Sequence, residues 1–187
     1  MKKMTTLFVV TYHKKGEMGT ISEEVRPENS WVFTDPDKVT ATVKFDGSAA
    51  MIKAGILYKR YDCKRGRIPP EEAIPCQEPD EISGHWPHWI RVTVDNPADR
   101  YFIEAYDPKL SDGTYELCGE KVGTNAERIT GHKLLKHGSV TVGIPNLSFE
   151  SIKEYLANPM HDIEGIVFHH EDGRMCKIRK SDFGFER

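Results

Sequence analysis

Short strand-like runs dominate this sequence, and this pattern limits the folds that the chain can adopt. In these runs β-branched and aromatic residues alternate with polar ones, and turn residues bound them, as in half-buried strands. The turn pairs Ala54-Gly55 and Asp172-Gly173 suggest hairpins, because glycine readily adopts a positive φ. The predicted fold class is therefore α+β, with mainly antiparallel sheets and few helices. The expected strands are residues 7–12, 39–45, 48–53, 56–61, 89–94, 101–106, 114–118, 140–144, 163–169 and 174–179.

One helix is clearly predicted, over residues 149–157. Ser148 can cap its N-terminus, apolar residues repeat on one face, and Asn158-Pro159 ends it. Residues 63–87 are rich in Pro, Glu and Gly and are predicted to form a loop-rich excursion. At 187 residues the chain is long enough to bury one core, so a single domain over residues 1–187 is expected.

Composition and charge narrow the class of protein. The net charge is −3, which argues against an unspecific nucleic-acid coat protein, and no apolar run is long enough to span a membrane. The short apolar run at 7–10 lacks a cleavage site after it and indicates a strand rather than a signal peptide. The four cysteines contain no Cys-x-x-Cys pair, which favours reduced thiols and a cytoplasmic protein.

Basic residues gather in two segments of the chain. Charge runs of this kind are commonly solvated faces, but a polyphosphate or nucleic-acid substrate also requires them. The sequence alone leaves both interpretations open. The first segment contains Lys53, Lys59, Arg60, Lys64, Arg65 and Arg67, and the second contains Arg174, Lys177, Arg179 and Lys180.

The tetrapeptide Lys44-Phe45-Asp46-Gly47 ends one of the expected strands. Strand alternation would point the lysine and the aspartate the same way, and the glycine allows a turn or the close approach of a ligand. An amine that attacks phosphorus must be neutral, and partial burial or neighbouring cations favour that form. Lys177 or Arg179 can supply such cations. Taken alone, the tetrapeptide also fits an ordinary exposed turn.

The last two expected strands form a hairpin that closes the chain. If Asp172-Gly173 is a two-residue turn, Phe168 lies opposite Lys177 and Ile166 lies opposite Arg179. Glu164 then shares a face with these four residues. An acid, an apolar surface and two cations suit a nucleotide, with the carboxylate available to a metal ion. The alternative is an amphipathic hairpin with surface charges, and a slip of one residue would reverse its faces.

Two other groups of residues have candidate roles. The hairpin after the tetrapeptide returns Arg60 beside Ala49, where a guanidinium suits a phosphate or ribose contact. The strand Tyr115-Glu116-Leu117-Cys118-Gly119 carries a glutamate, which in isolation is usually an exposed strand charge. Residues His85, Trp86, His88 and Trp89 can stack on bases, although such side chains more often serve packing.

In their order along the chain these motifs resemble the covalent nucleotidyltransferases, which include nucleic acid ligases and RNA capping enzymes. The resemblance rests on Lys-x-Asp-Gly at 44–47, Arg60, Tyr-Glu-Leu-x-Gly at 115–119, Glu-Gly-Ile-Val at 164–167 and Lys-x-Arg at 177–179. The pattern looks most like a small family of ATP-dependent 5′-to-3′ RNA ligases, and local matches at 86–90, 137–138 and 163–169 support this branch. It implies an adenylation domain of the ligase and capping-enzyme type.

The resemblance also implies roles for individual residues. Lys44 would be the adenylylated lysine, and Asp46 would orient it. Glu116 and Glu164 would contact ribose or a metal ion and its waters. Lys177 would contact the α-phosphate, with Arg179 or Lys180 as its partner, because the usual Lys-x-Lys reads Lys-x-Arg here. The remaining implied nucleotide contacts are Val43, Gly47, Arg60 and Ile166.

The implied reaction joins an RNA 5′-phosphate to a 3′-hydroxyl through lysyl-AMP and adenylylated RNA. The implied cofactors are ATP and Mg²⁺ or Mn²⁺, and end-healing enzymes are possible partners. Because the chain ends at residue 187, we expect no C-terminal OB domain, which disfavours a DNA ligase or a capping enzyme. The alternatives are a nucleotide- or RNA-binding module without turnover and a minimal DNA ligase.

Overall fold

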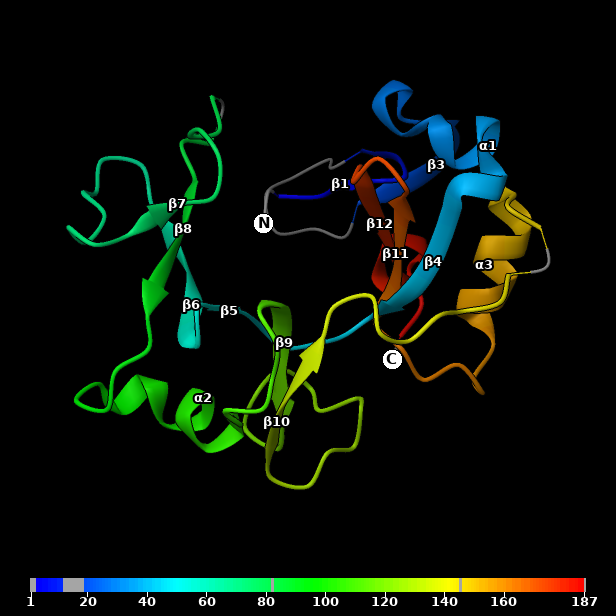
Figure 1. Ribbon diagram of the computed structural model, residues 1–187. Coiled ribbons are helices and arrows are strands. Elements are labelled where there is room, and N and C mark those ends of the chain that lie inside the picture. Colours follow the sequence, from blue (N-terminus) through cyan, green and yellow to red (C-terminus); the bar gives the residue numbers. More distant parts are fainter. Residues whose placement is uncertain (1–2, 12–18, 82, 145, 187) are drawn as a thin grey trace. The chain divides into compact units, whose positions relative to one another are not determined.

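The computed structural model describes residues 3–11, 19–81, 83–144 and 146–186 (Figure 1). The chain divides into two compact units. The central unit contains residues 46–137 together with Lys3, and the terminal unit contains residues 4–45 and 138–187. The predicted α+β class with mainly antiparallel sheets is confirmed, whereas the single domain over 1–187 stays a prediction. In the described part of the chain no helix is long and apolar enough to cross a membrane.

The terminal unit is built on a four-stranded sheet with the order β1-β12-β11-β4 (Figure 1). Its strands are β1 (Thr5–Thr6), β4 (Val39–Lys44), β11 (Gly165–His170) and β12 (Met175–Arg179). Only the β1–β12 pair is parallel. A separate antiparallel pair is formed by β2 (Phe8–Thr11) and β3 (Thr20–Val25); Tyr12, the end of the expected strand 7–12, lies outside the described residues.

One face of this four-stranded sheet forms the core of the terminal unit. The helices α1 (Trp31–Thr34) and α3 (Phe149–Ala157) contribute to that core, and short 3₁₀ turns η1 (Pro27–Asn29), η2 (Pro36–Lys38) and η4 (Lys180–Phe183) complete the unit. Helix α3 has the predicted bounds. Its start is capped as predicted, since the Ser148 side chain accepts a hydrogen bond from the Ser151 N–H at 3.2 Å. Its Ile152 and Leu156 are fully buried.

The central unit is built on a six-stranded antiparallel sheet with the order β10-β9-β5-β6-β8-β7. Its strands are β5 (Ser48–Lys53), β6 (Ile56–Cys63), β7 (Ile74–Pro75), β8 (Trp86–Arg91), β9 (Gly113–Gly119) and β10 (His132–Lys136). The predicted turn Ala54-Gly55 joins β5 to β6 with φ of 52° and 71°. The predicted excursion at 63–87 contains mostly loops and the short strand β7.

The second core lies on one face of this six-stranded sheet, where helix α2 (Arg100–Ala105) packs. The sequence analysis was wrong here, because it predicted a strand at 101–106. The turn η3 (Pro97–Asp99) precedes the helix, with Asn96 capping it and Pro97 at its first position. The helical turn buries Phe102 among Ile52, Leu57 and other core residues, which favours the helix over a strand. Residues 140–144 also form no strand beyond an isolated bridge between Thr42 and Thr141.

Candidate functional site

The register of the closing hairpin differs by one residue from the prediction. His170, rather than Glu171, pairs with Arg174: the His170 N–H donates to the Arg174 carbonyl at 2.9 Å, and the Gly173 N–H donates to the His170 carbonyl at 2.9 Å. Three residues therefore form the loop, and Asp172 stabilises it by accepting a hydrogen bond from the Arg174 N–H. Lys177 consequently lies opposite Val167, and Arg179 lies opposite Gly165.

In this register Lys177 and Arg179 pair with Val167 and Gly165 in place of the predicted Phe168 and Ile166. Ile166 and Phe168 are fully buried in the core with Ile178, so Ile166 does not line a nucleotide site as was predicted. Val43 pairs with Ile166 on the same face, and its N–H donates to the Val140 carbonyl at 2.8 Å, so the structure gives no support to the predicted Val43 contact. The one-residue shift moves apolar side chains into the core and leaves the cations on the opposite face.

The face of the four-stranded sheet that lies opposite the core carries three cations. Gly165 lies between Lys44 on β4 and Arg179 on β12, and Val167 lies between Thr42 and Lys177 in the next row. Residues directly opposite on neighbouring strands point to the same side of a sheet. Lys44, Lys177 and Arg179 therefore share one face, although they come from two ends of the sequence.

Glu164 joins this group from the residue before β11. Its Oε2 accepts a hydrogen bond from the Lys44 ammonium, and both side chains are about four-fifths buried, at 20% and 19% exposed. The Glu164 carbonyl accepts a hydrogen bond from the Lys180 N–H at 3.0 Å, which fixes the start of the strand. A Cβ at the next residue, Gly165, would lie 2.2 Å from the Ile178 carbonyl oxygen. Only glycine fits there, because the Ile178 main chain occupies the position that a side chain would need.

Lys177 is the cation whose protonation the fold disfavours. Burial is the main cause that lowers the pKa of Lys177, and the positive charges of Lys44 and Arg179 lower it further. Glu164 and Asp182 act in the opposite direction. The terminal unit thus holds a partly buried ammonium near two other cations, an arrangement that an incoming polyanion would stabilise.

We predict that Lys177→Met stabilises the fold. The pKa of Lys177 is lower in the folded state than in the unfolded state, so the charged amine opposes folding at neutral pH. The variant should therefore have a higher midpoint of thermal unfolding at neutral pH, and the difference should shrink as the pH approaches the ordinary lysine value of about 10.4. Lys133→Met, at an exposed position of β10, is the control. It should change neither the midpoint of thermal unfolding nor its dependence on pH. A lower midpoint for Lys177→Met would show that the amine contributes favourably to folding.

Arg179 and Lys180 differ in their surroundings. Arg179 lies on the Lys44 face, and its Nη2 donates to Asp182 Oδ1 at 2.7 Å. Lys180 begins η4 and is 7% exposed. Of the two alternatives for the second cation of Lys-x-Arg, the strand register places Arg179 beside Lys177. The sequence analysis did not anticipate that Asp182 would hold this arginine.

Thr42 and His169 form a further polar pair on the same face. Thr42 is 2% exposed, and its Oγ1 lies 2.9 Å from His169 Nε2. The adjacent His170 points to the other side, where its ring packs edge-on against Trp31. The two adjacent histidines thus lie on opposite sides of the strand, as alternation requires.

The central unit contains Asp46 and Gly47. Strand β4 ends at Lys44, so alternation does not relate Lys44 to Asp46 as was expected. One Asp46 carboxylate oxygen accepts hydrogen bonds from the Thr124 N–H at 2.8 Å and from its hydroxyl at 2.7 Å, and the Asp46 N–H donates to Glu127. Asp46 therefore anchors the loop that follows β9, a role that only the structure reveals.

Glu116 and Arg60 lie on one face of the central sheet. The neighbours of Glu116 on β9, Tyr115 and Leu117, belong to the core beside α2, so Glu116 faces the other way. Ala49 pairs with Glu116, and Arg60 follows Lys59, which pairs with the next residue of β5, Ala50. Arg60 Nε donates to Asp62 at 3.1 Å and its guanidinium lies over the Trp89 ring.

His137 is a partner of Glu116 that the sequence analysis did not assign. Its Nε2 lies 2.8 Å from Glu116 Oε2, and the two side chains are 21% and 13% exposed. The imidazole N–H fixes the orientation of the carboxylate. No strand was expected at 132–136, so the pairing of β10 with β9 that brings His137 to Glu116 is known only from the structure.

The predicted metal ligands, Glu116 and Glu164, each have a nitrogen partner, His137 and Lys44. Among the described residues no three His, Cys, Asp or Glu side chains gather into a group that can hold a metal ion. A lone carboxylate fits Mg²⁺ or Mn²⁺ that is held mainly by substrate phosphates and water. The metal role of both glutamates stays a prediction.

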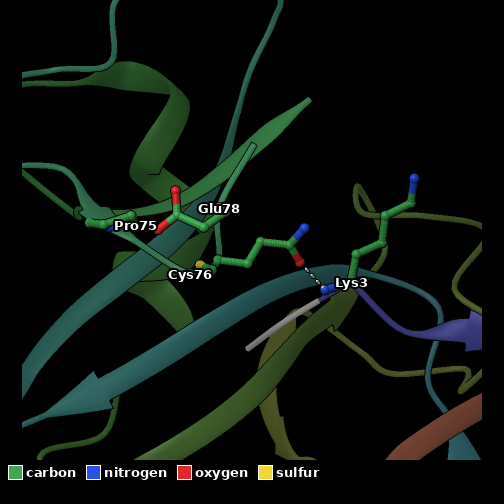
Figure 2. A pocket seen from close by; sticks show the side chains of 5 residues that line it. Lys3, Pro75, Cys76 and Glu78 are labelled. Carbon is green, nitrogen blue, oxygen red and sulfur yellow. Dashed lines mark hydrogen bonds between the residues drawn. The ribbon is translucent and has the colours of Figure 1, made fainter. Parts of the chain in front are cut away.

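The proposed base-stacking residues mostly serve packing. His88 and Trp89 are buried at 1% and 3% exposed, and Trp86 Nε1 donates to the Gln77 carbonyl at 2.8 Å. Near them, a hollow of about 580 Å³ is lined by Lys3, Pro75, Cys76, Gln77 and Glu78 (Figure 2). The Lys3 N–H donates to the Gln77 side chain at 2.6 Å on its wall. None of the predicted site residues lines this hollow.

Comparison with known proteins adds an independent observation. Residues 103–187 match the family model described as RNA ligase 1. This match supports an RNA ligase family. It spans a little under half of the chain and includes Glu116, Glu164, Lys177 and Arg179, whereas Lys44, Asp46 and Arg60 lie outside it. No curated protein matches the chain.

Proposed function

We propose that this protein is an ATP-dependent RNA ligase that joins an RNA 5′-phosphate to a 3′-hydroxyl. The observation that carries the proposal is the group of Lys44, Lys177, Arg179 and Glu164 on one face of the terminal sheet. Three cations on one face of a sheet suit the phosphates of a nucleotide. The RNA ligase 1 match supports the same activity from a different direction. The fold implied is that of a nucleotidyltransferase adenylation domain.

Lys44 is the proposed nucleophile. Its Nζ attacks the α-phosphorus of ATP, a P–N bond forms, and the bond from phosphorus to the bridging oxygen breaks so that pyrophosphate leaves. The Lys44 ammonium first loses one proton to become a nucleophile, and Glu164, which already accepts a hydrogen bond from that nitrogen, can receive it. The nitrogen loses a second proton to solvent once the P–N bond has formed. Lys177 and Arg179 stabilise the charge that develops on the phosphate oxygens.

The second and third steps use the same group. AMP passes from Lys44 to the 5′-phosphate of RNA, which breaks the P–N bond and forms a pyrophosphate linkage. The 3′-hydroxyl then attacks the RNA phosphorus, and AMP leaves as the phosphodiester forms. A divalent metal bound by Glu164 or Glu116 would neutralise phosphate charge. Asp46, Gly47, Arg60 and Lys180 are the other proposed contributors to nucleotide binding.

Two other functions compete with this proposal. A nucleotide- or RNA-binding module without turnover would keep the cationic face but would not form a covalent adduct. A minimal DNA ligase would form the adduct and seal DNA. Neither alternative has an observation of its own in its favour, because the one family match is to an RNA ligase.

The deciding experiment compares matched substrates with the same purified protein. We expect α-labelled ATP to leave covalent label on the protein that is stable to alkali and labile to acid, as a P–N bond is. A nicked duplex with a 5′-phosphorylated RNA strand should be sealed. An all-DNA nick of the same sequence should be sealed poorly or not at all. Equal sealing of both would make DNA ligase the better description. Stable label without any sealing would indicate a different acceptor for AMP, and absence of label would favour a binding module.

A further inference from the structure

The fold separates the six cations that the sequence places in one basic segment. Lys59 lies on the core side of the central sheet and forms a salt bridge with fully buried Asp99. Arg60 donates to Asp62, and Lys53 ends β5 beside the turn to β6. Only Lys64, Arg65 and Arg67 remain together, and these three are exposed.

These three cations occupy a defined loop directly after β6. The Arg67 N–H donates to the Lys64 carbonyl at 3.0 Å, and Gly66 has a φ of 77°, so the chain turns sharply here. The buried Cys63 thiol donates to the Arg67 carbonyl at 3.2 Å. None of the three cations has an ion-pair partner within the described ranges of the chain. The loop thus presents three exposed positive charges that no salt bridge holds among the described residues.

The Arg65 side chain is positioned by a second loop. A Cβ at Gly84 would lie 2.8 Å from both Cβ and Cγ of Arg65, so the stem of the arginine packs on the glycine backbone. Gly84 has a φ of 67°, and its N–H donates to the Asp80 carbonyl at 2.7 Å. This packing supports the stem and leaves the guanidinium exposed, as amphipathic side chains do at surfaces.

The strand register places this loop at a particular end of the central sheet. Ser48 at the start of β5 pairs with Leu117 near the end of β9, and β6 runs antiparallel to β5. The end of β6 therefore lies at the edge where β5 begins, which is the edge that follows Asp46 and Gly47. Lys44 precedes Asp46 by two residues. The three cations and the motif residues Asp46 and Gly47 lie at the same end of the central sheet, whereas Lys53 lies at the other end.

We propose that Lys64, Arg65 and Arg67 form a contact surface for the phosphate backbone of the RNA substrate. The inference rests on the proposed ligase function. Cations without protein partners bind a polyanion at little cost, because no salt bridge has to be broken. Contacts to phosphate position a strand without reading its bases, which suits an enzyme that joins ends of many sequences. An acidic protein surface is the competing occupant, but RNA accounts better for a location at the sheet end that also carries Asp46 and Gly47 of the nucleotidyl-transfer motif.

The test uses Lys64→Ala, Arg65→Ala and Arg67→Ala combined in the full chain. Binding of a fluorescent 5′-phosphorylated RNA nick is measured over a salt titration, and formation of the lysyl-AMP adduct is measured separately by intact mass. We expect the slope of log affinity against log salt to become shallower by roughly 2 to 3. Adduct formation should be unchanged, since the loop does not belong to the proposed nucleotide site.

The control removes three positive charges away from the loop: one at the end of β5, one at the end of β8 and one in the loop after α2. Lys53→Ala, Arg91→Ala and Lys109→Ala are exposed positions that suit this purpose. The proposed RNA surface would be overturned if the salt slope changed equally in both triple variants. It would also be overturned if the slope changed in neither variant, and an acidic protein would then remain as the occupant. Loss of the adduct in the loop variant would also overturn it, because the cations would then act on the nucleotide. Absence of the adduct in the unchanged protein would instead reject the proposed function.

Discussion

Replacing Lys44 by alanine is expected to abolish the covalent AMP adduct while the protein stays folded. No other amine of the described terminal unit combines contact with a carboxylate and a place beside Lys177 and Arg179 in the sheet register. The change leaves Glu164 without its ammonium partner, but that side chain is 20% exposed and water can solvate it. Intact-mass measurement after incubation with ATP and magnesium reads the adduct directly, and circular dichroism reads the fold.

The matched control is Lys109→Ala, which removes an exposed lysine in the loop after α2. This variant should form the adduct as the unchanged protein does. An adduct of full occupancy on Lys44→Ala would move the nucleophile to another residue, and peptide mapping of the labelled position would identify it. Such a result would count against the whole proposed mechanism, because Lys177 and Glu164 derive their roles from their positions relative to Lys44.

Replacing Gly47 by alanine is expected to destabilise the central unit strongly. A Cβ at this position would lie 2.0 Å from the Leu117 carbonyl oxygen and 2.9 Å from its carbonyl carbon. These are main-chain atoms of β9, and Leu117 itself is 1% exposed in the core, so neither strand can move aside easily. Overpacking of this kind commonly costs about 1 to 3 kcal/mol, and backbone contact places Gly47→Ala at the upper end.

Urea unfolding measures this loss as a lower midpoint at an unchanged slope. Gly143→Ala is the control, because no atom lies within 4 Å of the Cβ that it would add. Equal midpoints for Gly47→Ala and the unchanged protein would mean that β5 and β9 separate locally without cost. In that case the glycine of the Lys-x-Asp-Gly motif would serve a ligand rather than the packing of two strands.

Local signals in the sequence were sufficient for elements whose causes are local. Ser148 and the apolar spacing after it define α3, and Ala54-Gly55 defines the turn between β5 and β6. The helix α2 shows where this reasoning fails. Tyr101, Phe102 and Ile103 favour a strand by their own preferences, but Asn96 and Pro97 start a helical turn and the core around Phe102 stabilises it.

The closing hairpin shows a second limit of sequence reasoning. Asp172-Gly173 predicts a turn, but the number of residues in the loop depends on hydrogen bonds that the Asp172 carboxylate and the His170 carbonyl accept only in the folded hairpin. One additional loop residue exchanged the predicted faces of Ile166 and Val167. Burial of Ile166, Phe168 and Ile178 in one core decided the register. In the predicted register the apolar side chains of β11 and those of β12 would lie on opposite faces of the sheet, so one of the two sets would be exposed.

The sequence by itself determined the fold class, the helix α3 and the order of motifs from Lys44 to Arg179 that predicts nucleotidyl transfer. These features depend on residue type and spacing, which are present in the unfolded chain. Only the tertiary structure decided that Glu164 is paired with Lys44, that Glu116 is paired with His137, and that the basic segment is reduced to three exposed cations in one loop. Such contacts join residues far apart in sequence, and their energies exist only when burial and strand register bring the groups together.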